Sequence, residues 1–112
     1  MKQRLLIMNG SKVIQANKDG GWQNQKVEKA GTLKPGIYNI YNAKEADKSI
    51  KQSGIIVHID STNVYQQVDK TIVAHAVSSF KDLPEVGSNK TITYKADEAL
   101  AESAQKLGQR VH

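Results

Sequence analysis

Gly54-Ile55-Ile56-Val57-His58-Ile59 is the strongest apolar run of the chain, and it decides the fold class. The run is rich in β-branched residues and presents apolar side chains on both faces, which is typical of a central strand. The turn-forming cluster 60–63 follows, and Val64-Tyr65-Gln66-Gln67-Val68 is expected to pair back against the run. Asp69-Lys70 marks a further turn before a strand over residues 71–76. The middle of the chain is therefore predicted to be a β-sheet.

Toward the N-terminus, turn signals separate further short strands. Asn9-Gly10 lies between Leu5–Met8 and Ser11–Gln15, and it supplies the two positive-φ residues that a type I′ hairpin requires. Asp19-Gly20-Gly21 predicts a second turn before a strand over 22–29. Lys34-Pro35-Gly36 predicts a third turn before a strand over 37–41. This half of the chain is also expected to be β-structure.

Three segments look helical. Helix formers with Ala43, Ala46 and Ile50 at helical spacing predict a short helix or a helical turn over 42–49, and residues 78–83 predict a short 3₁₀ or helical connection. A strand over 90–94 follows. From residue 97 we expect a C-terminal helix, because acids stand at its start, bases near its end, and one stripe is apolar. The stripe consists of Leu100, Ala101, Ala104 and Leu107.

These elements predict a mainly β (α+β) protein: a small, strongly curved antiparallel sheet or an SH3/OB-like barrel, with a short internal helix and a C-terminal helix. At 112 residues, we expect a single β-rich domain over residues 1–95. Residues 96–112 would form the helix, either packed on the domain or acting as a tail.

Composition narrows the functional classes. The chain has no cysteine, which excludes disulfides, thiolate metal sites and a cysteine nucleophile. The apolar stretch Leu5–Met8 is too short for a signal peptide or a spanning helix, so we expect a cytoplasmic protein without a membrane partner. No Gly-rich phosphate loop is present, and we expect no cofactor and no metal site.

Basic residues are concentrated early in the chain. Residues 1–56 hold ten Lys and Arg against four acids, a balance of +6, whereas residues 57–112 hold six against seven. Such asymmetry points to a polyanionic partner such as nucleic acid, and the alternative is a scattered, solvated set of lysines. Aromatic residues are interspersed with the early lysines, as in small β-domains that stack on bases. The predicted nucleic-acid-binding residues are Lys12, Lys26, Lys29, Lys34, Tyr41 and Lys44.

Catalysis has few candidates. His58 and Asp60 share a strand face, and His75 lies in a later strand, so a small enzyme built on these three residues is one alternative. Their spacing matches no recognised metal-ligand pattern. We therefore expect a protein that is not an enzyme.

Three groups of short motifs resemble the KfrB-type domain of bacterial plasmids. They are Leu33-Lys34-Pro35-Gly36-Ile37-Tyr38; Gly54 to Asp60 with Val64-Tyr65-Gln66; and His75 to Phe80 with Pro84-Glu85-Val86-Gly87 and Ile92-Thr93-Tyr94. The resemblance runs from about residue 30 to residue 95. It implies a role in plasmid maintenance or conjugative transfer. The matched positions, of unknown role, are His58, Asp60, Tyr65, Gln66, His75 and Phe80.

The leading functional hypothesis is a non-enzymatic, plasmid-encoded accessory module that binds nucleic acid or a DNA-bound partner protein through a basic surface. The partner is then expected to be a plasmid maintenance or transfer protein. An alternative is a protein-binding adaptor that adds a strand at an edge such as Thr91–Tyr94, or that docks its terminal helix on another chain.

Overall fold

The computed structural model describes residues 2–103 and divides the chain into two compact units. Unit 1 comprises residues 1–43 and unit 2 begins at Lys44. The single β-rich domain over residues 1–95 that the sequence predicts stays a prediction. Each unit contains its own sheet, so the prediction of a mainly β fold is confirmed.

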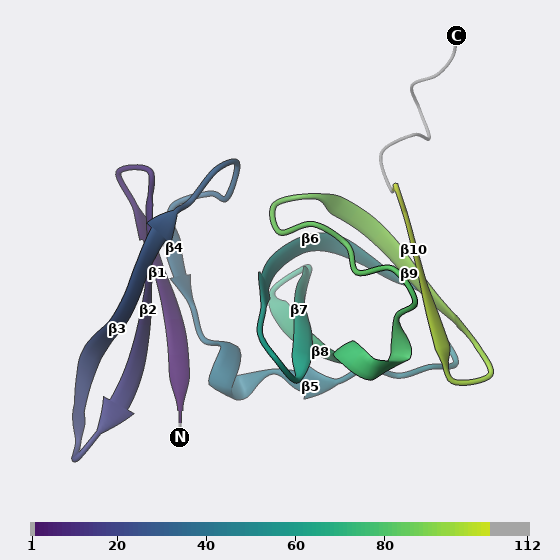
Figure 1. The fold of residues 1–112 in the computed structure, drawn as a ribbon, viewed down its shortest axis with the longest axis horizontal. Coiled ribbons are helices and arrows are strands. Elements are labelled where there is room, and N and C mark those ends of the chain that lie inside the picture. The colour runs from purple at the N-terminus through teal and green to yellow at the C-terminus, as the bar shows by residue number, and fades with distance from the viewer. Residues whose placement is uncertain (1, 104–112) are drawn as a thin grey trace, which may run out of the picture. The chain divides into compact units, whose positions relative to one another are not determined.

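Unit 1 is a four-stranded sheet in the order β3-β2-β1-β4. All neighbouring strands in it are antiparallel, and Figure 1 shows them in purple and blue. A 3₁₀ turn, η1, follows the last strand. The elements are β1 (Gln3–Met8), β2 (Ser11–Lys18), β3 (Gly21–Lys29), β4 (Gly36–Tyr38) and η1 (Ile40–Asn42).

Both predicted hairpins of unit 1 are confirmed. Asn9 and Gly10 have φ of 51° and 76°, and Asp19 and Gly20 have φ of 52° and 83°. Two consecutive left-handed residues match the twist of the flanking strands, which is why Asn-Gly and Asp-Gly stand there. The strand predicted over 22–29 is also present, with a register irregularity between Ile14 and the next residue of β2.

The two faces of the unit 1 sheet differ sharply. The inner face presents Leu5 and Ile7 from β1 and Ile14 and Ala16 from β2, all buried. The alternate residues form the outer face, as strand geometry requires. We define the outer face as Lys2, Arg4, Leu6, Met8, Val13, Gln15, Trp22, Asn24, Val27, Lys29 and Ile37.

Unit 2 is a six-stranded sheet in the order β10-β9-β6-β7-β8-β5. All pairs are antiparallel except the two-residue contact between β5 and β8, which is parallel. The elements are β5 (Lys44–Glu45), β6 (Gln52–Ile59), β7 (Asn63–Val68), β8 (Thr71–Ala76), η2 (Val77–Ser79), β9 (Asn89–Lys95) and β10 (Glu98–Ser103).

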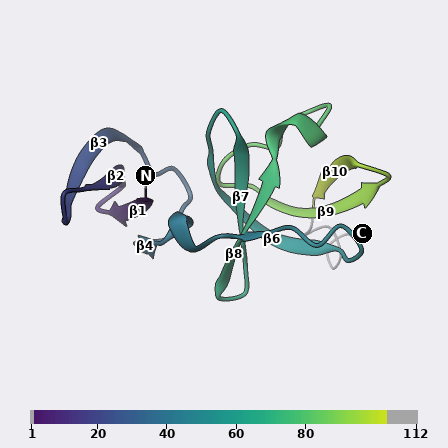
Figure 2. The same ribbon diagram turned by 90° about the horizontal axis from the view of Figure 1, so that it is seen from below.

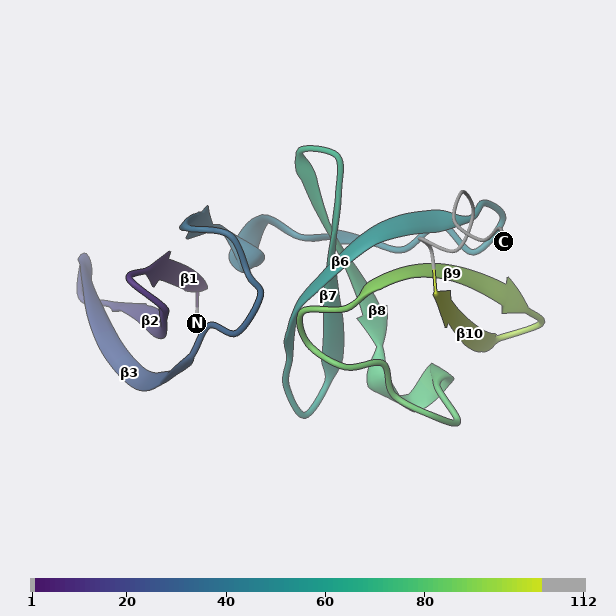
Figure 3. The ribbon, with the colours of Figure 1, turned by 90° about the horizontal axis from the view of Figure 1, so that it is seen from above.

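β6 is the central strand, as its apolar sequence predicts, and it curves the sheet. Its first half pairs with β9 through Gln52–Ile55, and its second half pairs with β7, with a register shift between Ile56 and His58. Bulges of this kind bend a strand and increase its twist. Figures 2 and 3 show β6 sweeping from β7 toward the β9–β10 hairpin. The sheet of the described residues is curled but is not a closed barrel.

The core of unit 2 lies inside this curl. Ile56, Val64, Ile92 and Ala99 are buried there, one from each of four strands. Ile59, Val77, Phe80, Tyr94 and Ala101 pack against them from the sides. An isolated parallel bridge joins Phe80 to Ala99, so the segment after η2 lies along β10.

Gly54 permits the close approach of β6 and β7. A Cβ at this position would lie 1.8 Å from the carbonyl oxygen of Gln67, closer than any side chain tolerates. The glycine that opens the apolar run is therefore required by packing between strands.

Three element predictions were wrong. Residues 98–103 form β10 and not the start of a helix, because they pair with β9 through six residues; residues 104–112 of that predicted helix lie outside the described part. Residues 42–49 hold the end of η1, β5 and turns instead of a helix. The strand predicted over 37–41 ends at Tyr38, and η1 begins two residues later, at Ile40.

No helix within residues 2–103 combines the length and the apolar character that crossing a bilayer demands.

Candidate functional site

Formal charge is divided unequally between the two units. Unit 1 holds seven Lys and Arg against two acids, a balance of +5, and residues 44–112 hold nine against nine. The net charge of +5 for the whole chain therefore resides in unit 1.

The predicted nucleic-acid-binding residues do not form one cluster. Lys12 lies on the inner face and is only 3% exposed, with its ammonium nitrogen 3.8 Å from Glu28. Lys26 is also on the inner side, 3.2 Å from the same carboxylate. Lys29 pairs with Ser11 and belongs to the outer face. The structure thus separates Lys29 from Lys12 and Lys26, which the sequence had grouped with it.

The other three predicted residues are exposed. Lys34 lies in the loop before β4, where its carbonyl accepts a hydrogen bond of 2.7 Å from the Tyr38 hydroxyl. Tyr41 lies in η1 and is 38% exposed. Lys44 begins β5 and so belongs to unit 2. Of the predicted set, only Tyr41 belongs to the cluster of charged and aromatic residues described next.

Arg4, Trp22, Tyr41 and Lys2 form a cation–aromatic cluster in unit 1. The guanidinium carbon of Arg4 lies 4.1 Å from the centroid of the Trp22 ring, and the Lys2 ammonium lies 5.6 Å from that of Tyr41. The two rings are 5.6 Å apart and tilted by 42°. Both cations lie within the range of a cation–π interaction.

Side-chain hydrogen bonds hold Arg4 in place. Its Nε donates to Oε1 of Gln15 over 2.8 Å, and Nε2 of Gln15 donates to Oδ1 of Asn24 over 2.9 Å. The three residues stand side by side on β1, β2 and β3. Sequence reasoning omitted Lys2, Arg4 and Trp22 from the site. The available signal was the alternation of Lys2 and Arg4 at the start of the first strand, together with Trp22 near the start of the third strand.

Burial makes Lys12 a structural residue of unit 1. Burial lowers the pKa of its ammonium group, and the attraction of Glu28 offsets only part of that effect. A lysine held this way contributes no exposed cation to a phosphate-binding surface.

Unit 2 contains a buried polar network centred on Gln66 and His75. Gln66 is fully buried, and its Nε2 donates to the carbonyl oxygens of Lys90 and Gln52 over 2.9 and 3.1 Å. Since the amide nitrogen of Gln66 is committed as a donor, its Oε1 accepts from Nε2 of His75 over 2.9 Å.

That assignment fixes the tautomer of His75. With the proton on Nε2, Nδ1 is the acceptor, and the Tyr94 hydroxyl donates to it over 2.7 Å. Burial lowers the pKa of His75 to about 4, so the imidazole is neutral at pH 7. Phe80 packs edge-on against the same ring at 6.1 Å between centroids.

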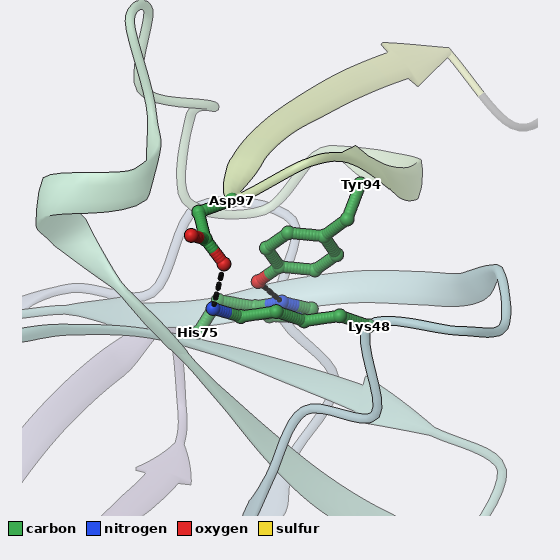
Figure 4. Close-up of polar contacts among 4 residues, drawn as sticks. All are labelled: Lys48, His75, Tyr94 and Asp97. Atoms are coloured by element: carbon green, nitrogen blue, oxygen red, sulfur yellow. Dashed lines mark hydrogen bonds and ion pairs between the residues drawn. The ribbon is translucent and has the colours of Figure 1, made fainter.

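An exposed ion pair lies over this network (Figure 4). Lys48 approaches Asp97 to 3.1 Å, and its ammonium lies 5.6 Å from the centroid of the Tyr94 ring. The pair joins the loop before β6 to the turn between β9 and β10. Because both side chains are solvated, the pair stabilises unit 2 only slightly.

His58, Asp60 and Tyr65 form a second group of motif positions. The rings of His58 and Tyr65 stack with centroids 6.1 Å apart, and His58 is 7% exposed. Oδ1 of Asp60 accepts from the backbone N–H groups of Thr62 and Asn63 over 2.8 and 2.7 Å, and from the Thr62 hydroxyl. Burial alone would raise the pKa of Asp60, but these hydrogen bonds and nearby His58 lower it overall.

Four of the motif positions, Asp60, Gln66, His75 and Phe80, therefore have structural roles in unit 2. Asp60 closes the β6–β7 turn as an Asx turn. Gln66 and His75 satisfy polar groups inside the curled sheet, and Phe80 packs on the imidazole. Within the described residues, no three His, Cys, Asp or Glu side chains are grouped so as to hold a metal ion.

A curled sheet around an apolar core, with a buried hydrogen-bond network of Gln66, His75 and Tyr94, defines unit 2 as a small β-sheet domain. Residues 51–103 match the family model of the KfrB Domain. This part of the chain is therefore similar to the KfrB domain, and the resemblance predicted from the sequence motifs is confirmed.

A curated protein of Escherichia coli, Protein TraB, is 35% identical to this chain over 94 residues. The alignment covers 81% of this chain and 64% of TraB, so the chain spans less than two thirds of that relative. Residues 44–112 make up less than 81% of the chain, so the aligned region must include part of unit 1.

Proposed function

We propose that this protein is a non-enzymatic, plasmid-encoded accessory module for plasmid maintenance or conjugative transfer, acting in the cytoplasm. In this proposal unit 1 binds nucleic acid, or a DNA-bound partner, and unit 2 supplies the KfrB domain. The observation that carries the proposal is the segregation of charge: unit 1 has a balance of +5, and residues 44–112 have none.

Charge of this kind favours a polyanion through counterion release. Each phosphate neutralised by Lys or Arg frees condensed cations, so binding weakens steeply as salt rises. The KfrB match lies wholly within unit 2, whose charges balance. This separation supports assigning the electrostatic contact to unit 1.

The test is a titration of labelled DNA with the full chain, read by fluorescence anisotropy at two salt concentrations. Lys29→Gln with Lys34→Gln should weaken binding and lower the salt slope by roughly 0.7–0.9 for each phosphate that is no longer neutralised. Lys70→Gln with Lys81→Gln in unit 2 is the matched control, because these four lysines are all exposed. Absence of binding at low salt would reject the nucleic-acid version and leave the version with a partner protein.

A second candidate is a protein-binding adaptor that accepts a strand from its partner. The edge named from the sequence, Thr91–Tyr94, was wrong, because β9 pairs with both β6 and β10. The edge strand beside β9 is β10, whose outer side carries the Phe80 bridge at Ala99 and where Leu100 is 47% exposed. Replacing Leu100 with Pro would remove a backbone donor, and unchanged capture of a plasmid transfer protein by this variant would count against strand addition.

The contacts of His75 and Asp60, two of the three candidate catalytic residues, support a non-enzymatic role. Both ring nitrogens of His75 are engaged by Gln66 and Tyr94, and Asp60 is engaged by its own turn. A general base needs access to a substrate proton. If His58→Gln combined with Asp60→Asn abolished plasmid transfer while the chain stayed folded, the enzyme alternative would regain support.

A further inference from the structure

The outer face of unit 1 combines rings and cations. In the described part of this unit neither acid lies on that face: Asp19 is in the β2–β3 turn, and Glu28 shares the inner side with Lys12 and Lys26. The cations on the outer face are Lys2, Arg4 and Lys29. A surface with this composition attracts anions without local competition from carboxylates.

An apolar row crosses the same face. Strand register places Val27 opposite Val13, Val13 opposite Leu6, and Leu6 opposite Ile37, one residue from each of the four strands. The two ends of the row are well exposed, Val27 at 61% and Ile37 at 56%. With strands about 4.8 Å apart, the row is about 14 Å long.

Trp22 and Tyr41 extend this apolar surface toward the first residues of β1. Their rings touch each other, and Arg4 and Lys2 lie against them. Gln15 and Asn24, joined by a hydrogen bond, separate the rings from the apolar row and carry amide groups suited to base edges. The face thus offers flat apolar contacts, amides and cations in adjacent rows.

We propose that the outer face of unit 1 binds single-stranded nucleic acid. Unpaired bases lie on Trp22, Tyr41 and the apolar row, while Lys2, Arg4 and Lys29 contact the phosphates. This inference rests on the proposed function and names its ligand. A duplex hides the flat faces of its bases and presents phosphates outward, so it cannot use the rings or the apolar row.

Trp22 is the one tryptophan of the chain, so its fluorescence reports directly on this face. The full chain is titrated with an oligo-dT strand and, separately, with a hairpin duplex of equal length at the same salt. We expect saturable quenching of Trp22 by oligo-dT, with an affinity at least about tenfold tighter than for the duplex, since stacking on a ring contributes roughly 1–3 kcal/mol per base.

Two variants test the contacts. Tyr41→Leu and Val27→Ser change exposed side chains, so circular dichroism should show an unchanged sheet. Tyr41→Leu should weaken oligo-dT binding about tenfold and leave duplex binding unaltered. Leu100→Ser, which changes an apolar side chain of similar exposure in unit 2, is the control for Val27→Ser and should have no effect.

The outcomes separate the two proposals. Equal affinity for strand and duplex, or binding without a change in Trp22 emission, overturns this inference and leaves the proposed function intact. Failure to bind either ligand at low salt overturns both nucleic-acid proposals. If a protein binds the outer face, oligo-dT does not, and Val27→Ser abolishes the protein binding, this inference is likewise overturned.

Discussion

The Gln66 side chain links its own strand to three other strands. It stands on β7, donates to carbonyl groups of Gln52 on β6 and Lys90 on β9, and accepts from His75 on β8. A buried amide with all its partners is stabilising, but its loss leaves several buried polar groups without hydrogen-bond partners. The hydrogen bonds across the curled sheet therefore require a side chain at this position that both donates and accepts, as glutamine does.

Replacing Gln66 with Leu should lower the free energy of unfolding by about 3 kcal/mol. The apolar side chain would leave the His75 Nε2–H and two carbonyl oxygens without partners, at about 1–3 kcal/mol for each buried group. Urea unfolding of the purified chain measures the change. Gln67→Leu, at the half-buried neighbouring position, is the control. Equal midpoints for the two variants would show that the network contributes little.

His75 should make the stability depend on pH. Its folded-state pKa is about 4, against an ordinary value of 6.5, so the unfolded chain binds the extra proton first. The contribution is complete above pH 6.5 and is lost as pH falls toward 4, by about 3 kcal/mol in total. The measurement is the urea midpoint across this range.

The histidine can be separated from other titrating groups. The lowered carboxyl pKa values of Asp47 and Asp60 make stability fall with acid in a lower window, below their ordinary value of 3.8. His75→Gln should therefore flatten the dependence between pH 6.5 and 4 whatever its absolute stability. A slope identical to that of the parent chain in this window would contradict the assignment.

At the level of elements, local turn chemistry was the reliable guide. Asn9-Gly10 and Asp19-Gly20 set the hairpins of unit 1, and the β-branched residues of β6 identified the central strand. Both signals depend on neighbours in the sequence. They therefore predict these elements independently of the tertiary contacts that the rest of the chain makes.

The helix predicted from residue 97 failed because pairing outweighed propensity. Its alanines favour a helix in isolation, yet β9 offers a partner, and Ala96 makes the turn with φ of 57°. Burial then alternates along β10, with Ala99 buried and Leu100 exposed. A short amphipathic segment carries both periods, and long-range contacts decide between them.

Gly54→Ala should destabilise unit 2 strongly. The added Cβ meets the carbonyl oxygen of Gln67 at 1.8 Å, and this oxygen belongs to backbone that cannot swing away. Separating β6 from β7 should cost about 3 kcal/mol or more. Gly21→Ala is the matched control, because its nearest contact is 3.9 Å away. Thermal unfolding of both variants measures the difference. Equal stability of Gly54→Ala and Gly21→Ala would refute the packing argument.

At the scale of the whole molecule, sequence reasoning identified the basic half but not its surface. It grouped lysines by nearness in the chain, whereas strand alternation sends Lys26 and Lys29 to opposite faces of β3. Burial of Lys12 depends on a contact with Glu28 across two strands. Register and burial arise from tertiary packing, which one sequence does not display.

The division of the chain into a basic unit and a charge-balanced unit, which matches the KfrB family model, predicts where a ligand acts. With saturating oligo-dT, amide hydrogen exchange of the full chain should slow in β1–β3, because a bound strand stabilises the sheet it covers. Exchange in β6–β8 should stay unchanged, since those strands belong to the unit without net charge. Lys29→Gln should reduce the protection in unit 1 at a fixed ligand concentration. Protection concentrated in β9 and β10 instead would move the binding surface to the KfrB unit and favour its edge strand as the contact.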